Sequence, residues 1–107
     1  MSVIEEIAAE RKRQIEVEGF TTADDDRHNE GEMGAAAACY AAPFRVFRAD
    51  EMSGRSYETF TAYRDGWPWH DEWWKPKGRR SDLIRAAALI VAEIERLDRL
   101  DREREGE

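Results

Sequence analysis

The feature that most constrains the fold is a long apolar stripe with helical spacing in the last quarter of the chain. A helix capped by Ser81 or Asp82 is predicted to run from there to about Arg102. Its apolar positions recur three or four residues apart: Leu83, Ala86, Ala87, Ile90, Ile94 and Leu97. This period is that of an amphipathic α-helix, so the sequence predicts a helix that buries one face.

Two further helices are predicted in the first half of the chain. The first is expected over residues 2–18, where Ser2 can cap its start and Gly19 can end it. The second is expected over residues 26–42, where an acidic run supplies the cap and Pro43 ends the helix.

The stretch from Phe44 to Trp74 has no regular period, and glycine and proline punctuate its second half. A short turn of helix is expected at Phe44, Val46 and Phe47, and residues 51–64 are expected as loop or as a further short helix. No alternating strand pattern is found. The sequence therefore predicts an all-α fold, a helical bundle with an irregular, aromatic-rich insertion.

The length of 107 residues predicts a single domain over residues 1–107, with a charged tail at 98–107 that is expected to fray. A small domain buries a limited share of its surface, so we expect oligomerisation to complete the core. The single cysteine, Cys39, allows no intrachain disulfide and fits a reducing cytoplasm. We expect neither a signal peptide nor a membrane span, and therefore a cytoplasmic protein.

The formal net charge of −7 makes duplex nucleic acid a poor partner, because affinity for it comes from neutralising phosphates. It leaves open a small phosphate-bearing ligand held in one local basic pocket.

A first candidate site lies at His28, Glu30 and Glu32 in the second predicted helix. His28 and Glu32 are four residues apart and so share a helix face, where an imidazole and a carboxylate can hold a divalent metal. The alternative is a solvated acidic face at a helix start.

A second candidate site is the basic run Lys75, Lys77, Arg79 and Arg80 ahead of Asp82. Arginines just before a helix start favour an anion, and guanidinium groups match phosphate oxygens. The carboxylate of Asp82 would repel phosphate unless a cation bridges them. The alternative is an Asp cap with exposed arginines.

A third candidate site is formed by the tryptophans in the insertion, at positions 67, 69, 73 and 74. Nucleobases stack on aromatic rings, so an aromatic loop beside a basic run is typical of a base-and-phosphate pocket. The alternatives are a satellite core under the insertion and a subunit interface.

The order of these elements resembles that of the MazG-like all-α nucleoside triphosphate pyrophosphohydrolases. In that family one helix carries Glu-Glu-x-x-Glu, the next carries Glu-x-x-Asp, and these acids hold Mg²⁺ on the triphosphate. Residues 28–33 lie over the first motif: Gly31 and Glu32 match, while His28 and Asn29 replace the first two glutamates.

Residues 79–82 lie over the second motif, in which Asp82 matches and Arg79 replaces the glutamate. The chain is more similar to a group of short phage proteins described as dATP/dGTP pyrophosphohydrolase-like, which includes the MazZ branch. The similar segments are Glu10-Arg11-x-Arg13-Gln14, Glu18-Gly19, Asp25-Asp26-x-His28, Gly31-Glu32, Ala36-Ala37, Cys39-Tyr40-Ala41, Trp67-Pro68-Trp69, Trp74-Lys75-Pro76 and Ala92-Glu93-Ile94-Glu95-Arg96.

The resemblance implies hydrolysis of a (deoxy)nucleoside triphosphate, with purine preferred, to the monophosphate and pyrophosphate. It implies a homodimer or homotetramer in a bacterial or phage-infected cell, with Mg²⁺ as cofactor and Mn²⁺ as a substitute. The predicted metal ligands and catalytic groups are Glu32, Asp82 and His28. The predicted substrate-binding residues are Arg79, Arg80 and Lys75 for the phosphates and Trp67, Trp69 and Trp73 for the base.

Two other functional classes stay open. Replacement of the motif acids by His28 and Arg79 fits a phage protein that sequesters nucleotides without hydrolysing them. A structural module whose acidic face docks a partner would use the tryptophans as interface anchors.

Overall fold

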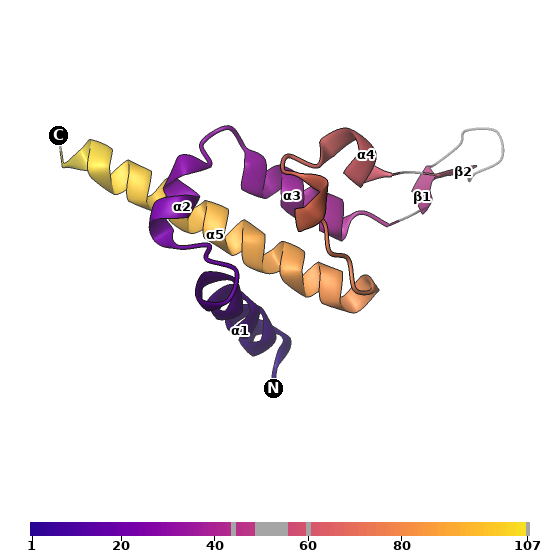
Figure 1. The fold of residues 1–107 in the computed structure, drawn as a ribbon, viewed down its shortest axis with the longest axis horizontal. Coiled ribbons are helices and arrows are strands. Elements are labelled where there is room, and N and C mark those ends of the chain that lie inside the picture. Colours follow the sequence, from indigo (N-terminus) through magenta and orange to yellow (C-terminus); the bar gives the residue numbers. More distant parts are fainter. Residues whose placement is uncertain (44, 49–55, 60, 107) are drawn as a thin grey trace.

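A computed structural model describes residues 1–43, 45–48, 56–59 and 61–106, and it is mostly helical (Figure 1). The elements in chain order are α1 (Val3–Glu16), α2 (Thr22–Arg27), α3 (Glu32–Ala41), β1 (Arg45–Arg48), β2 (Ser56–Thr59), α4 (Ala62–Gly66), the 3₁₀ turn η1 (Asp71–Trp73) and α5 (Arg79–Glu105). The predicted helical class is thus confirmed at this level.

The cap predicted for the first helix is present at its start. The Ser2 hydroxyl oxygen accepts a hydrogen bond from the Glu5 backbone N–H at 3.1 Å, and the Glu5 carboxylate accepts one from the Ser2 N–H at 3.2 Å. The helix ends at Glu16, and Gly19 takes a positive φ of 76° that a side chain would disfavour.

The single helix predicted over residues 26–42 is wrong, because the chain forms α2 and α3 with a break between them. Thr21 caps α2, because its hydroxyl oxygen accepts a hydrogen bond from the Asp24 N–H at 3.2 Å. The acidic run that was predicted to supply the cap lies within α2 instead. The break comes before Gly31, whose φ of 83° is left-handed and interrupts a right-handed helix.

A short antiparallel hairpin replaces the turn of helix predicted at Val46 and Phe47. In its register, Val46 pairs with Glu58 and Phe47 pairs with Tyr57. Branched and aromatic side chains suit strands, but four residues are too few to show an alternating period. The prediction for Phe44, and that for positions 51–55 and 60, lies outside the described residues.

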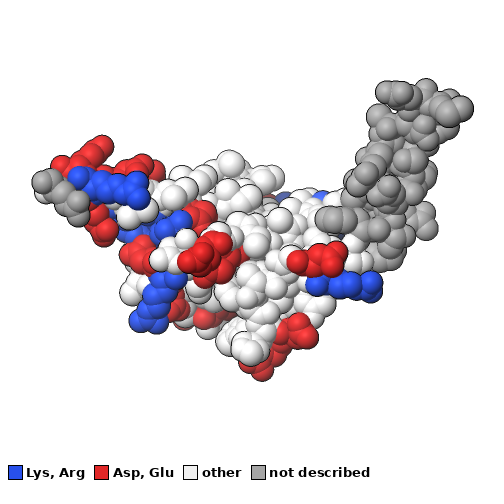
Figure 2. Space-filling model, turned by 90° about the horizontal axis from the view of Figure 1, so that it is seen from above, with Lys and Arg blue, Asp and Glu red and all other residues white. Residues whose placement is uncertain are grey.

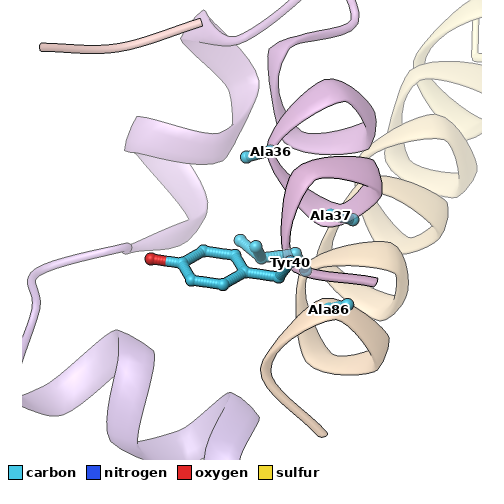
Figure 3. Packing of buried hydrophobic residues seen from close by; sticks show 5 residues of the cluster. Ala36, Ala37, Tyr40 and Ala86 are labelled. Atoms are coloured by element: carbon cyan, nitrogen blue, oxygen red, sulfur yellow. The ribbon is translucent and has the colours of Figure 1, made fainter. Parts of the chain in front are cut away.

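The core lies along the seam between α3 and α5, which run antiparallel and make the most extensive contact of any two helices (Figure 1). Its fully buried residues are Ala36, Ala37, Tyr40, Ala86 and Leu89. Alanine side chains allow two helices to approach closely, and Figure 3 shows the Tyr40 ring projecting from this seam, with its hydroxyl pointing away from both helices.

The helix α5 begins at Arg79, earlier than predicted, and the expected fraying at 98–107 is not seen as far as Glu105. Both α1 and α2 also pack against it. Within the described ranges, no helix combines the length and the apolar character needed to cross a membrane.

Candidate functional site

A pocket of about 570 Å³ opens between the α1–α2 connection and the segment that leads into η1. We call it the aromatic pocket. Its walls are formed by Glu18, Phe20, Asp24, His28, Pro68, Trp69, His70 and Trp73.

Trp69 is the central side chain of this pocket. Its ring centroid lies 6.1 Å from that of Phe20, 5.3 Å from that of His28 and 5.4 Å from that of Trp67. Trp73 is 48% exposed. Of the three tryptophans predicted to bind a base, Trp69 and Trp73 therefore offer ring surface to a ligand in this pocket.

Trp67 and Trp74 have a different role from the other two tryptophans. The Trp74 ring stacks on Tyr40 at 4.6 Å and on Tyr63 at 5.0 Å, and Trp67 meets Tyr40 edge-on at 5.6 Å. The Trp67 indole N–H also donates to the His70 carbonyl oxygen at 3.0 Å. Trp67 and Trp74, together with Trp69, thus pack against the α3–α5 core and do not form a separate satellite core.

A much smaller cavity of about 20 Å³ shares four wall residues with the aromatic pocket, namely Glu18, Phe20, Trp69 and Trp73. We call it the inner cavity. Its remaining walls are Gln14, Tyr40, Trp67, Lys75, Arg85 and Leu89.

A network of ion pairs between α1 and α5 lies beneath these pockets. Arg13 donates to Glu10 at 2.6 Å and to Glu18 at 3.1 Å, and Arg85 lies within 4 Å of the same two carboxylates. Burial disfavours the charged form of Glu10, but hydrogen bonds from Arg13 and Gln14 and the nearby arginine charges outweigh it and lower the pKa of Glu10. The network fixes the Glu18 carboxylate at the pocket wall.

No functional role was predicted from the sequence for the residues of this network. The segment that includes Arg13 and Gln14 was noted only as part of the family resemblance. The available indication was that Arg11 and Gln14 are three residues apart and so share one face of the first helix with Ile4, Ile7 and Ile15. Both are buried in the structure. Buried polar side chains on an inward helix face are a sign of a site or of a polar core.

A third pocket, of about 350 Å³, lies between α1 and the start of α5 and includes Lys77, Arg80 and Asp82 in its walls. The Asp82 carboxylate accepts a hydrogen bond from the Lys77 backbone N–H at 2.9 Å, and Arg80 pairs with Glu6 at 3.0 Å. Arg79 is exposed at the helix start. The prediction of Ser81 or Asp82 as the helix cap is wrong, because Gly78 occupies the cap position without a side-chain cap hydrogen bond and Asp82 lies in the first turn of α5.

The predicted metal set of Glu32, Asp82 and His28 does not gather at one place. His28 lines the aromatic pocket and Asp82 lines the pocket at the start of α5. Glu32 accepts a hydrogen bond from the Glu30 N–H at 2.6 Å.

The antiparallel packing explains why Glu32 and Asp82 are apart. Tyr40 meets Arg85, which is less than one turn beyond Asp82, and Glu32 lies about 12 Å from Tyr40 along α3. Within one chain these carboxylates do not fit a single ion, and the described residues contain no group of three His, Cys, Asp or Glu placed to hold one.

Comparison with known proteins found no matching family model, no similar curated protein and no similar solved structure.

Proposed function

We propose that this protein binds a nucleoside triphosphate and hydrolyses it to the monophosphate and pyrophosphate. The observation that carries the proposal is the aromatic pocket, whose Trp73 ring lies beside the Lys75 ammonium. Its volume of about 570 Å³ falls within the range typical of small-molecule sites.

The base would stack in the aromatic pocket. Trp69 and Trp73 supply flat surface there, and base stacking on aromatic side chains is worth about 1–3 kcal/mol per base. The His28 side chain faces the same pocket, and its Nδ1 is buried without a hydrogen-bond partner among the described residues.

The phosphates would lie toward the basic segment. The Lys75 ammonium is 5.6 Å from the centre of the Trp73 ring, next to the base site. Arg79 follows at the start of α5 with an exposed side chain, and Arg80 beside it pairs with Glu6 in the pocket at the start of α5. Such cations neutralise charge on a triphosphate and on its transition state.

The separation of Glu32, Asp82 and His28 favours a second candidate function, which is nucleotide binding without hydrolysis. A requirement for Mg²⁺ or Mn²⁺ follows from the family resemblance and not from a gathered set of ligands. Figure 2 shows acidic and basic side chains interspersed on one face, with a broad uncharged area, and this arrangement gives little support to duplex nucleic acid as the ligand.

We also propose that the protein assembles as a homodimer or homotetramer. A stripe of apolar side chains on α5 is exposed in the single chain: Leu83 at 43%, Ile90 at 47%, Ile94 at 52% and Leu97 at 44%. These positions recur every three, four or seven residues, and such a stripe is suited to packing against another helix.

The test is pyrophosphate release from the eight common ribo- and deoxyribonucleoside triphosphates, with Mg²⁺, with Mn²⁺ and with chelator, beside calorimetry of binding. Metal-dependent release from one or a few nucleotides supports hydrolysis. Binding without release supports the second candidate, and no binding of any nucleotide refutes both.

Two variants connect that assay to the pocket. Trp69→Ala should weaken nucleotide binding about 5- to 150-fold, as expected for the loss of one stacking contact, while pyrophosphate binding stays unchanged. Trp69→Phe keeps an aromatic face and serves as the matched control. Equal loss of nucleotide and pyrophosphate binding in Trp69→Ala would show that the ring is needed for folding and not for the base.

A further inference from the structure

The segment that joins η1 to α5 begins with two of the groups that the proposed function uses, the Trp73 ring for the base and the Lys75 ammonium for the phosphates. Both side chains are exposed. The backbone over residues 74–78 is neither helix nor strand. Other parts of the chain therefore have to pair its polar groups if the segment is to keep one position.

Tyr40, which comes from α3, contacts three consecutive residues of this segment. It is only 4% exposed, and its ring stacks on that of Trp74 with the centroids 4.6 Å apart. Its hydroxyl accepts a hydrogen bond from the Lys75 backbone N–H at 3.1 Å and donates to the Trp73 carbonyl oxygen at 3.4 Å. One buried side chain thus holds the middle of the segment by stacking and both flanking peptide groups by hydrogen bonds.

Arg85, which comes from α5, holds the other polar group of the Lys75 backbone. Its Nη1 donates to the Lys75 carbonyl oxygen and to the Tyr40 hydroxyl, both at 3.1 Å. Arg85 is 8% exposed, and its guanidinium lies within 4 Å of the Glu10 and Glu18 carboxylates. The N–H and the carbonyl of Lys75 are therefore both bonded to buried side chains, while its ammonium lies 5.6 Å from the centre of the Trp73 ring.

We propose, resting on the proposed function, that Tyr40 and Arg85 are positioning residues that hold Lys75 where its ammonium meets the phosphates of a bound nucleotide. They act through Lys75 and need no contact with the ligand. A segment that is already fixed does not have to be ordered when the nucleotide binds, and this saving appears as affinity.

The experiment measures binding of the eight common nucleoside triphosphates by calorimetry in wild type and in Tyr40→Phe. The substitution keeps the ring and its stacking and removes only the hydroxyl. Affinity for the triphosphates that wild type binds should fall about fivefold, the effect of one hydrogen bond of ordinary strength. Tyr63→Phe is the matched control: Tyr63 also stacks on Trp74, at 5.0 Å, but its hydroxyl bonds to Asp71, so wild-type affinity is expected.

A double-mutant cycle with Lys75→Gln separates positioning from a general contribution to stability. In the Lys75→Gln background no ammonium remains to be positioned, so Tyr40→Phe should change the affinity by less than about twofold. The same loss in both backgrounds would overturn the inference, and so would wild-type affinity in a Tyr40→Phe protein that is folded by circular dichroism. If Tyr40→Phe does not fold, Arg85→Lys, which keeps the charge and removes the guanidinium, is measured in the same two backgrounds with the same expectation.

A wild type that binds none of the eight triphosphates would remove the proposed function, and this inference with it. Tight binding that is indifferent to Tyr40→Phe would remove only the inference.

Discussion

The Arg11–Asp25 ion pair is the contact whose loss we expect to lower the free energy of unfolding most. The Arg11 guanidinium donates to Asp25 Oδ2 at 2.8 Å, and the two side chains are 10% and 2% exposed. The pair joins α1 to α2, and the Asp25 carbonyl oxygen also accepts the His28 backbone N–H at 3.0 Å. The ion pair therefore holds the C-terminal end of α2 in place, and with it His28, which lines the aromatic pocket.

Asp25→Ala should cost about 3–5 kcal/mol, because removal of one partner leaves the other charge buried and unpaired. Arg11 keeps a second contact to Glu95 at 3.4 Å, but that carboxylate is half exposed and gives a weak substitute. For a domain of this size each 1 kcal/mol lowers Tm by roughly 4–8 °C, so a fall of at least about 12 °C is expected.

The assay is urea unfolding followed by tryptophan fluorescence, with Asp24→Ala as the matched control. Asp24 is the adjacent residue, and its pair with Arg27 at 3.4 Å lies at the surface, so its loss should cost no more than about 1 kcal/mol. If the two variants lose the same small amount, the buried pair does not stabilise the fold as argued. The double variant Arg11→Met/Asp25→Leu should be more stable than Asp25→Ala, because it leaves no unpaired charge.

Two further predictions concern pH and assembly. Because its arginine partners lower the pKa of Glu10, the stabilisation it gives is complete above the ordinary value of 4.5 and is lost as the pH falls through the lower value in the fold. The urea midpoint should therefore drop on acidification less steeply in Glu10→Gln than in wild type, and equal slopes would contradict the assignment. Ile94→Glu should reduce the mass measured by sedimentation to that of one chain, whereas Asp98→Asn should not; a wild type that is already monomeric would refute the proposed use of the α5 stripe.

The parts of the fold that follow from the sequence are those set by local chemistry. The helical state of α5 and the capping box of Ser2 and Glu5 depend on residues a few positions apart, and both could be predicted. The buried face of α5 was predicted wrongly: of the predicted apolar stripe only Ala86 is buried, whereas Leu83, Ile90, Ile94 and Leu97 are exposed in the single chain. The break before Gly31 depends on a positive φ that glycine permits but does not require. The pairing of β1 with β2 joins segments that are not adjacent in the sequence, and four-residue strands do not indicate it.

The residue types of the candidate site could be predicted from the sequence, but which of these residues would lie together could not. The aromatic and basic residues of the insertion were recognised, and Trp69 and Trp73 do face a common pocket. Which tryptophans would face inward was not predictable, because Trp67 and Trp74 pack against Tyr40, which is distant from them in the sequence. The separation of Glu32 from Asp82 follows from the antiparallel register of α3 and α5, which no short motif encodes.

The α1–α5 interface differs in its chemistry from the seam between α3 and α5. The seam between α3 and α5 is closed mainly by alanine and leucine, whereas the contact of α1 with α5 buries Arg11, Gln14 and Arg85. Apolar residues of similar volume would stabilise such a contact as well or better. The polar groups instead position Glu18 and leave Gln14 Oε1 buried without a hydrogen-bond donor among the described residues, an arrangement that costs stability. The α1–α5 interface is therefore energetically weaker than it would be with apolar residues at these positions.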